Sequence, residues 1–412
     1  MRLRAVVSAL AMLVLTVGLF IFGKITGGFF AWFLFYFFLV VAVYEWITMF
    51  ASLTRVTSHR QLSLHRLTAG QTLDVQVSLA RRGVWPLFWL RIHEALPPRW
   101  LFQTNGLERI HVPLWTRKME YAYSVQNVPR GVYELGDTKV ETGDLFGFVR
   151  GTKTFEGRDK VIIYPKVVPV RGWSGHSPDD YGDRQPTNRR SEDSSNVIGV
   201  RDYVKGDRLN RIHWPVTARR GQLQAKEFEL HVTSEFLFIP DNTEASYSGD
   251  SPAHVKFDLS MCITASLLRH AYDNHRKFGM MVPTEPYVFF PTGLDAALLT
   301  RCMESLASMQ PDSKRDVISF LRRVGDESTR GTVFVIVSPR LDQEMAVAVS
   351  RLKRQGTVHL FVPTVRDRLT DSERTGVELL QSAGAQVYLI RKPEQLSFLH
   401  KGGASGATIS SY

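Results

Sequence analysis

The sequence predicts a multidomain protein with a transmembrane helical hairpin, an antiparallel β-sandwich-like domain and an α/β domain. Three observations support this fold class. Two long apolar stretches lie near the start of the 412-residue chain. Short segments follow in which apolar and polar residues alternate, which is the period of half-buried strands. Further along, strand-like and helix-like segments alternate, as is typical of a mostly parallel sheet with helices on both faces.

The apolar stretches are Ala5–Phe22, which has no charged residue, and Phe29–Phe50, which has only Glu45. At about 1.5 Å rise per residue, each is long enough to cross a hydrocarbon core of about 30 Å. Gly23–Gly28 provides a short turn between them. Residues 1–52 are therefore predicted to form a two-helix transmembrane anchor.

The basic residues around the hairpin predict its orientation. The turn carries only Lys24, whereas arginines flank the outer ends of the two stretches at Arg2, Arg4, Arg55, Arg60 and Arg66. The positive-inside rule then places both termini and the soluble domains in the cytoplasm, next to the cell membrane. A cleaved signal peptide is the alternative, but no small-residue cleavage site follows Phe22 and a second apolar stretch comes at once.

The chain has 51 Lys and Arg against 40 Asp and Glu, a formal net charge of +11. Such a charge favours an anionic partner, either nucleic acid or a membrane surface. No basic platform with interleaved aromatic residues suggests nucleic acid. We expect Arg55, Arg60 and Arg66 to meet anionic lipid head groups, each contributing about 1 kcal/mol. Glu45, between two aromatic residues, is predicted to be an interfacial carboxylate.

Residues 56–170 are predicted to form the sandwich-like domain. Apolar and polar residues alternate through Leu73–Leu79. Further strands are predicted at Leu87–His93, Glu120–Val125, Thr138–Glu141 and Val161–Tyr164. Short strands separated by turn residues are typical of an antiparallel sandwich or barrel. The polar, turn-rich residues 171–200 are predicted to be a linker.

Residues 230–400 are predicted to form the α/β domain, followed by a disordered tail over 401–412. Strands are predicted at Glu235–Ile239, Met280–Val282, Tyr287–Phe290, Val333–Val337, Val358–Val362 and Val387–Ile390, the second and third as a hairpin-like pair. Helices are predicted from Ser251-Pro252, at Leu294–Ser308, Arg315–Arg323 and Gln343–Arg354, and from about Asp371. Thr370 and Glu373 form a capping box for the last helix. Cys262 and Cys302 are expected to be buried packing residues, since two cysteines exclude a disulfide framework.

Residues 201–229 mix charged, aromatic and glycine positions at a density that surface loops rarely have. We hypothesise that Asp207 and Arg219 form a buried bidentate pair, with Trp214 packed over a guanidinium group. An acid/base pair of Asp207 and His213 is the alternative. No nucleophile at a strand–helix elbow accompanies that pair, and no Walker-type loop predicts ATP binding. A structural or interaction role is therefore favoured.

Motifs in this segment also carry a family resemblance. They are Arg201-x-Tyr203, Gly206-Asp207, Arg211-Ile212-His213-Trp214, Ala218-Arg219 and Lys226-x-Phe228-Glu229. Supporting motifs are Arg130-Gly131-Val132-Tyr133, Asp144-Leu145-Phe146-Gly147 and Tyr164-Pro165. With these motifs the chain resembles the bacterial domain-of-unknown-function family 58. The resemblance implies a membrane hairpin, a sandwich-like domain and a Rossmann-like C-terminal domain similar to von Willebrand factor type A. It also implies a MoxR-type AAA+ ATPase as partner, because such proteins are commonly encoded together.

The resemblance further implies a metal site. A type A domain holds Mg²⁺ at the strand carboxyl ends through Asp-x-Ser-x-Ser, a later threonine and a further aspartate, all oxygen ligands. Asp241 and Thr243 match this pattern, and Thr292 is the candidate third ligand. Ala245 has no side-chain oxygen, and Arg340 stands where a carboxylate is expected. The alternative is that Asp241 and Thr243 cap their loop.

The leading expectation from the sequence is a membrane-anchored cytoplasmic adaptor that is not an enzyme and docks protein partners. The segment 201–229 would couple the two soluble domains. One alternative is a metal-dependent ligand-binding receptor that uses the degenerate Mg²⁺ site. Another is a hydrolase that uses His213 and Asp207. Neither a nucleic acid nor a small-molecule substrate is expected.

Overall fold

The structure is a computed structural model. It describes residues 2–51, 56–83, 85–101, 108–147, 150–173, 175, 197–204, 207, 209–228, 235–248, 253–284, 286–328, 331–366 and 369–399. The chain divides into two compact units: Met1–Lys166 with Leu306–Ser308, and Val167–Ser305 with Met309–Tyr412. The predicted tail and most of the predicted linker lie outside the described residues.

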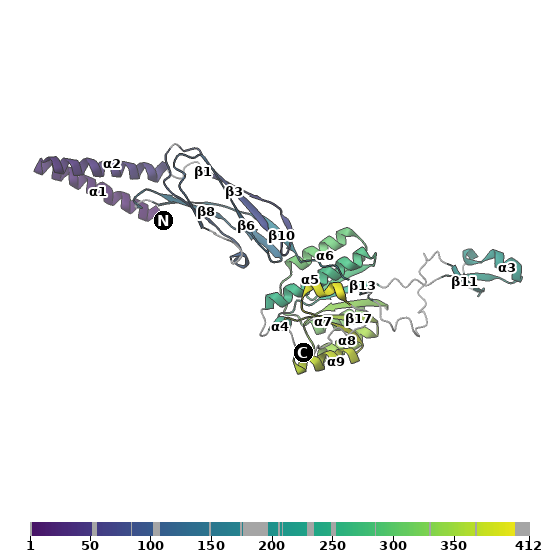
Figure 1. Ribbon diagram of the computed structural model, residues 1–412. Coiled ribbons are helices and arrows are strands. Elements are labelled where there is room, and N and C mark those ends of the chain that lie inside the picture. Colours follow the sequence, from purple (N-terminus) through teal and green to yellow (C-terminus); the bar gives the residue numbers. More distant parts are fainter. Residues whose placement is uncertain are drawn as a thin grey trace. The chain divides into compact units, whose positions relative to one another are not determined.

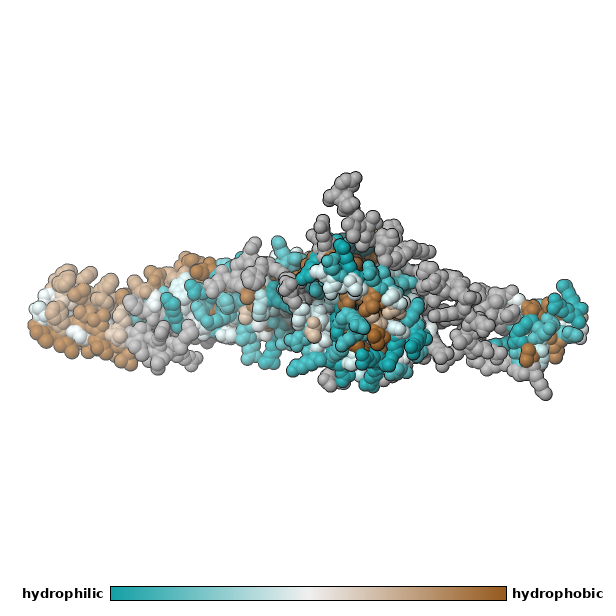
Figure 2. All heavy atoms as spheres, turned by 90° about the horizontal axis from the view of Figure 1, so that it is seen from below, coloured by the Kyte–Doolittle hydropathy of each residue, from teal (hydrophilic) through white to brown (hydrophobic). Residues whose placement is uncertain are grey.

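Two helices begin the first unit, α1 (Arg2–Thr26) and α2 (Phe29–Ala51). They lie side by side (Figure 1) and pack through aromatic side chains. Both are long and apolar enough to cross a membrane, over Ala9–Thr26 and Phe29–Thr48. Hydrophobic residues cover the visible face of this helix pair (Figure 2). The predicted pair of apolar helices is present.

The carboxylate of Glu45 is enclosed by protein. Its side chain is 0 % exposed, and among the described residues neither carboxylate oxygen has a hydrogen-bond partner. It lies close enough to the buried Asp144 for the two charges to interact. The carboxylate is enclosed because α2 meets the β-rich region at this position, and its interfacial level in a membrane stays a prediction.

The rest of the first unit is β-rich. Its strands are β1 (Val56–Leu62), β2 (Arg66–Thr68), β3 (Leu73–Arg81), β4 (Leu90–Glu94), β5 (Glu108–His111), β6 (Lys118–Val125), β7 (Gly131–Leu135), β8 (Thr138–Gly143), β9 (Arg150–Phe155) and β10 (Asp159–Tyr164). They form sheets with the orders β1-β3-β6, β2-β10-β7 and β5-β4-β8-β9. Neighbouring strands are antiparallel, except for the parallel pair β2 and β10.

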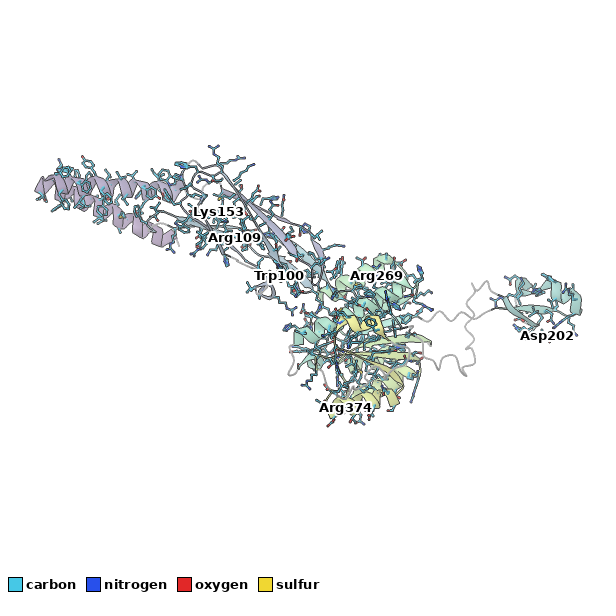
Figure 3. All side chains as sticks on the ribbon, viewed as in Figure 1. Trp100, Arg109, Lys153, Asp202, Arg269 and Arg374 are labelled. Carbon is cyan, nitrogen blue, oxygen red and sulfur yellow. The ribbon has the colours of Figure 1, made fainter. Side chains whose placement is uncertain are left out.

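The alternation predicted for Leu73–Leu79 is confirmed. The apolar residues of this stretch are at most 1 % exposed, and the polar residues between them face outward or lie only partly buried. Trp100, Val140 and Ile163 join the same hydrophobic core, with Trp100 marked in Figure 3. Burial of these apolar side chains is the main driving force for folding of the region.

Arg60 is part of this interior, so its predicted contact with lipid head groups is wrong. The Arg60 side chain is 6 % exposed and forms an ion pair with Glu94, whose side chain is 3 % exposed. The guanidinium also lies 3.4 Å from Asp159 and donates to Thr138 Oγ1 at 2.9 Å. Residues of β1 alternate between the two faces of their sheet, and position 60 falls on the inward face.

The second unit contains a six-stranded sheet with the order β15-β14-β13-β16-β17-β18. The strands are β13 (Phe236–Pro240), β14 (Phe278–Val282), β15 (Val288–Gly293), β16 (Thr332–Val337), β17 (Gly356–Pro363) and β18 (Ala385–Ile390). Neighbours are parallel, except that β15 runs antiparallel to β14. The predicted α/β character and the hairpin-like pair are thereby confirmed.

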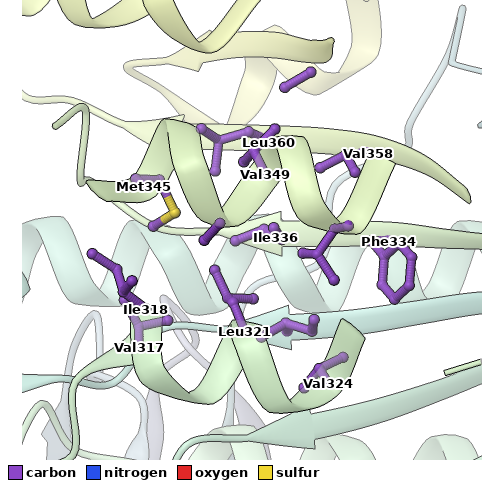
Figure 4. Close-up of a cluster of buried hydrophobic side chains, with 14 of the residues drawn as sticks. Val317, Ile318, Leu321, Val324, Phe334, Ile336, Met345, Val349, Val358 and Leu360 are labelled. Atoms are coloured by element: carbon purple, nitrogen blue, oxygen red, sulfur yellow. The ribbon is translucent and has the colours of Figure 1, made fainter. Parts of the chain in front are cut away.

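Helices cover both faces of this sheet (Figure 1). They are α4 (Glu244–Tyr247), α5 (Ala253–Asp273), α6 (Ala296–Ser308), α7 (Val317–Glu327), α8 (Gln343–Lys353), α9 (Asp371–Ser382) and the 3-10 helix η4 (Pro393–Phe398). A hydrophobic core joins α7 and α8 to the strands, with Leu321, Phe334 and Val349 among its side chains (Figure 4). The capping box of Thr370 and Glu373 is confirmed at the start of α9.

The motif segment forms small elements of its own: β11 (Val197–Asp202), the 3-10 helix η3 (Leu209–Arg211), α3 (Trp214–Arg220) and β12 (Gln224–Phe228). β11 and β12 form a two-stranded antiparallel sheet. β11 begins inside the predicted linker 171–200, so the linker prediction was wrong at that end. The valine- and isoleucine-containing start of β11 forms a strand because β12 provides a pairing partner.

Candidate functional site

The carboxyl ends of β13 and β16 meet at the centre of the six-stranded sheet. After β13 the chain continues to β14 on one side, whereas β16 lies on the other side and leads to β17. Ligands of α/β proteins commonly bind where the strand order reverses in this way. Asp241 follows β13 and Ser338 follows β16, so the topology brings these two side chains together.

Asp241 is fully buried at the carboxyl ends of these two strands. Its carboxylate accepts hydrogen bonds from the Ser338 hydroxyl at 2.7 Å and from the backbone N–H of Thr243 at 2.9 Å. Burial raises the pKa of Asp241, although these hydrogen bonds act in the opposite direction. The neutral form of the side chain is therefore more favoured here than in a solvent-exposed aspartate.

The guanidinium of Arg340 is the cation of this site. It lies 2.6 Å from carboxylate oxygens of both Asp316 and Asp342, and 3.5 Å from Glu344. Desolvation alone lowers the pKa of Arg340, but the hydrogen bond to Asp342 and the charges of Asp342, Asp316 and Asp241 together raise it. A permanent positive charge, supplied by the chain itself, is thus held near the buried Asp241.

Thr292 lies at the amino ends of the parallel strands, at the opposite end of the sheet from Asp241. Its prediction as a metal ligand together with Asp241 is therefore wrong. Its hydroxyl donates to Glu235 at 2.9 Å, and Glu235 immediately precedes β13. Because β15 is antiparallel to its neighbour, the end of β15 lies at the amino ends of the parallel strands. The hairpin-like pair predicted from the sequence already implies this reversal of direction, which the family pattern for the metal ligands does not take into account.

The residues at the carboxyl ends of β13 and β16 do not fit a Mg²⁺ site. Thr243 donates its hydroxyl to the carbonyl of Arg315 at 3.1 Å and its N–H to Asp241, so the pair caps the loop. Mg²⁺ needs several oxygen ligands, preferably ionised carboxylates. Within the part of the chain that the structure describes, no three histidine, cysteine, aspartate or glutamate side chains are grouped to hold a metal.

We expect Asp241→Asn to stabilise the protein at neutral pH but not in acid. A raised pKa means that the folded protein binds this proton more tightly than the unfolded chain, so the contribution of Asp241 to stability falls as pH rises above about 4. Asparagine keeps an acceptor for Thr243 and has no charge to desolvate. Thermal midpoints of the full chain in detergent at about pH 4 and pH 7.5 measure the effect.

Asp326→Asn is the control for this prediction, because Asp326 is exposed on α7. This control should leave the thermal midpoint unchanged at both pH values. An equal shift for Asp241→Asn at the two pH values would contradict the account.

Ion pairing in the motif segment differs from the hypothesis. Asp207 forms a bidentate pair with Arg201, with nitrogen–oxygen distances of 2.9 and 2.8 Å, and not with Arg219. The same carboxylate accepts from the backbone N–H of Val204 at 3.0 Å. Arg219 is exposed near the end of α3. Pairing is therefore local, because the turn that follows β11 returns Asp207 to Arg201.

Other motif residues also maintain the local structure. His213 is the N-cap residue of α3, and its Nδ1 accepts from the backbone N–H of Val216 at 3.4 Å. The Tyr203 hydroxyl donates to the carbonyl of Asp207 at 3.3 Å. Arg211 is half-buried, as is Lys226 on β12 opposite Val200, whereas Gly206 and Glu229 lie outside the described residues. These contacts give no support to an acid/base pair of His213 and Asp207.

Gln224 has a structural role that the sequence does not indicate. It is 1 % exposed, its side-chain amide donates to Asp202, and its backbone N–H donates to Thr217 at 3.0 Å. It thereby joins β11, β12 and α3, and Figure 3 labels Asp202 in this segment. A single glutamine in a short strand carries no sequence signal for such a role.

Both cysteines are buried, as predicted. Burial raises the pKa of the Cys302 thiol to about 12, so this group remains protonated at neutral pH. A nucleophile needs the thiolate form and access to a substrate. Cys302 is neither ionised nor accessible, so it lacks both properties of a nucleophile.

Residues 199–372 match the family model DUF58, described as a protein of unknown function. The DUF58 match includes the whole motif segment, residues 201–229, and the sheet strands from β13 to β17. The chain is also similar to the uncharacterized protein YeaD of Bacillus subtilis (strain 168), with 28 % identity over 344 residues, or 80 % of this chain and 82 % of that protein. The DUF58 resemblance inferred from the motifs agrees with the family match over residues 199–372.

Among the solved structures that match is the cupredoxin domain of amoB from Nitrosocaldus yellowstonii, with 13 % identity. It covers 27 % of this chain and 87 % of that domain, with a TM-score of 0.20. A similarity at this score adds nothing to the description of the fold.

Proposed function

We propose that the protein is a membrane-anchored adaptor whose motif segment docks a protein partner on the cytoplasmic side. The apolar pair α1 and α2 supports the anchor, and the flanking arginines support the orientation. The DUF58 resemblance suggests a MoxR-type AAA+ ATPase as the partner. We further assign the α/β region to the von Willebrand factor type A-like folds, which the strand order with its antiparallel edge strand β15 supports.

The observation that carries the docking proposal is the exposure of Trp214. This side chain is 62 % exposed, and the nearby Leu209 is 71 % exposed. The visible surface of the segment has hydrophobic residues among hydrophilic ones (Figure 2). Exposed tryptophan is costly in water and is enriched, with arginine, at the centres of protein interfaces.

The internal bonds of the segment strengthen this argument. The pair of Arg201 and Asp207, the cap formed by His213 and the buried Gln224 fix the backbone. Trp214 is therefore displayed on a structured support. Rigid presentation lowers the entropic cost of binding. Arg219 and Arg220, both exposed at the end of α3, add positive charge suited to an acidic partner surface.

Co-purification tests this proposal. Tagged full-length chain is captured from solubilised membranes, and the recovered proteins are quantified by mass spectrometry. Loss of a central tryptophan commonly costs 2 kcal/mol or more, so Trp214→Ser should lower recovery of the AAA+ ATPase by about tenfold or more.

Phe289→Ser is the matched control for this capture, since Phe289 is 50 % exposed on β15 and lies outside the motif segment. It should recover as much partner as the unaltered chain does. Equal recovery by Trp214→Ser and the unaltered chain would count against the docking role.

A further inference from the structure

Exposed apolar side chains gather at the end of the β-rich region that meets α2. Leu114 and Trp115, in the loop between β5 and β6, are 42 % and 65 % exposed. Leu145 and Phe146, in the loop between β8 and β9, are 57 % and 53 % exposed. Single exposed apolar residues are ordinary, but large ones on two loops at one end indicate an interaction surface.

The loop between β8 and β9 is bonded to the last turns of α2. The backbone N–H of Leu145 donates to the Tyr44 hydroxyl at 3.3 Å, and the rings of Phe146 and Tyr44 lie 6.3 Å apart. The fully buried Asp144 accepts from the backbone N–H of Phe146 at 3.0 Å, and its carbonyl accepts from Trp89 at 3.2 Å. These bonds fix the loop beside the end of the apolar helix.

The loop between β5 and β6 is tied to the same place through Arg81 and Trp85. The Arg81 guanidinium donates to the carbonyl of Leu114 at 2.9 Å and to the carbonyl of Trp85. The indole N–H of Trp85 donates to Thr48 Oγ1 at 3.0 Å. Thr48 ends the stretch of α2 that is apolar enough to span a membrane. Both loops therefore lie at the level where that stretch ends.

The charged residues within the two loops and the adjoining stretch 81–88 are almost all basic. Across residues 81–88, 112–118 and 143–150 the one acidic residue is the buried Asp144. The exposed basic residues of these stretches are Arg82, Arg117, Lys118 and Arg150. Basic residues near a membrane are attracted to anionic lipids, and tryptophan is enriched at the level of the head groups.

We propose that these two loops insert their apolar side chains into the surface of an anionic lipid bilayer, so that the β-rich region lies on the membrane. The inference rests on the proposed membrane anchor. Continuity with α2 and the charge of the loops favour lipid over a protein as the occupant. Trp115 and Phe146 would lie among the head groups, and the nearby arginines would pair with phosphates.

Site-specific fluorescence quenching tests this proposal. The full chain carries Cys262→Ala and Cys302→Ala, and one new cysteine at Trp115 or Leu145 is labelled with an environment-sensitive dye. The protein is reconstituted in phosphatidylcholine–phosphatidylglycerol liposomes. Quenching by lipids with a spin label near the head group is compared with quenching by aqueous iodide.

Two further labels calibrate the result. Val40→Cys, 69 % exposed on α2, reports whether the helix is in the bilayer. Thr72→Cys, exposed just before β3, lies at the other end of that strand from Arg81. We expect the labels at 115 and 145 to be quenched by spin-labelled lipid several-fold more than the label at 72. Phosphatidylglycerol-free liposomes should reduce this difference.

The other outcomes overturn the inference in distinct ways. One such outcome is that lipid quenches the label at position 40 while iodide quenches the labels at positions 115 and 145. This result would support the membrane anchor and refute insertion of the loops. Protection of 115 and 145 from both quenchers would assign the surface to protein contact. Absence of lipid quenching at 40 would refute the membrane anchor and, with it, this inference.

Discussion

Replacing Arg60 with methionine is expected to destabilise the β-rich region by about 3–5 kcal/mol, because it leaves a buried carboxylate without its cation. Glu94 is 3 % exposed and accepts from the Tyr121 hydroxyl at 2.6 Å and from Thr138 at 3.0 Å. Neutral donors of this kind do not replace an ion pair. The β-rich region of Arg60→Met should therefore unfold locally more often than that of the unaltered protein.

Hydrogen exchange of the full chain in detergent measures this effect by peptide. Amides of β3 and β6 should exchange more than about a hundredfold faster in Arg60→Met, since each 1.4 kcal/mol is a factor of ten in the opening equilibrium. Peptides of the second unit should not change. The double variant Arg60→Met with Glu94→Gln should recover part of the protection, because it removes the uncompensated charge. Unchanged protection in Arg60→Met would refute the role assigned to the pair.

Replacing Arg340 with aspartate is expected to make stability depend on Mg²⁺, which the unaltered protein should not show. The change removes the guanidinium from Asp316 and Asp342 and adds a carboxylate near Asp241 and Ser338. Without metal the loss should be about 1–3 kcal/mol, towards the lower value because Asp316 and Asp342 are 45 % and 42 % exposed. A divalent cation would then meet the oxygen ligands it requires.

Thermal midpoints with and without Mg²⁺ decide this prediction. At about a hundredfold excess over its dissociation constant, Mg²⁺ should return about 2.7 kcal/mol to Arg340→Asp. Arg340→Ala is the matched control, which should lose similar stability and gain nothing from the metal. A comparable Mg²⁺ response in the unaltered protein would contradict the assignment of Arg340 as the cation of this site.

Features set by local patterns could be predicted from the sequence. The alternation in β3, the apolar length of α1 and α2 and the capping box of Thr370 and Glu373 each depend on neighbouring residues alone. Successive strands and helices similarly indicated the α/β region, because a parallel sheet requires crossover connections. In these cases the local physical preference agrees with the fold.

Features set by distant contacts could not be predicted in the same way. The position of Arg60 after the apolar helix predicts a contact with lipid, but its partner Glu94 comes from another strand. Thr292 is a candidate ligand on the family pattern alone, whereas the predicted hairpin-like pair puts the end of β15 at the amino ends of the parallel strands. The pairing of Asp207 with Arg201 depends on a turn whose geometry the sequence does not specify. Which of the many charged residues form ion pairs with one another is determined only by the folded structure.

Photo-crosslinking at position 214 tests the docking role most directly. A photoreactive amino acid replaces Trp214 in the full chain, cells are irradiated, and the adducts are identified by mass spectrometry. We expect an adduct with a MoxR-type AAA+ ATPase at position 214 and none when the same amino acid replaces Phe289. No protein adduct at 214, or the same adduct at both positions, would contradict it.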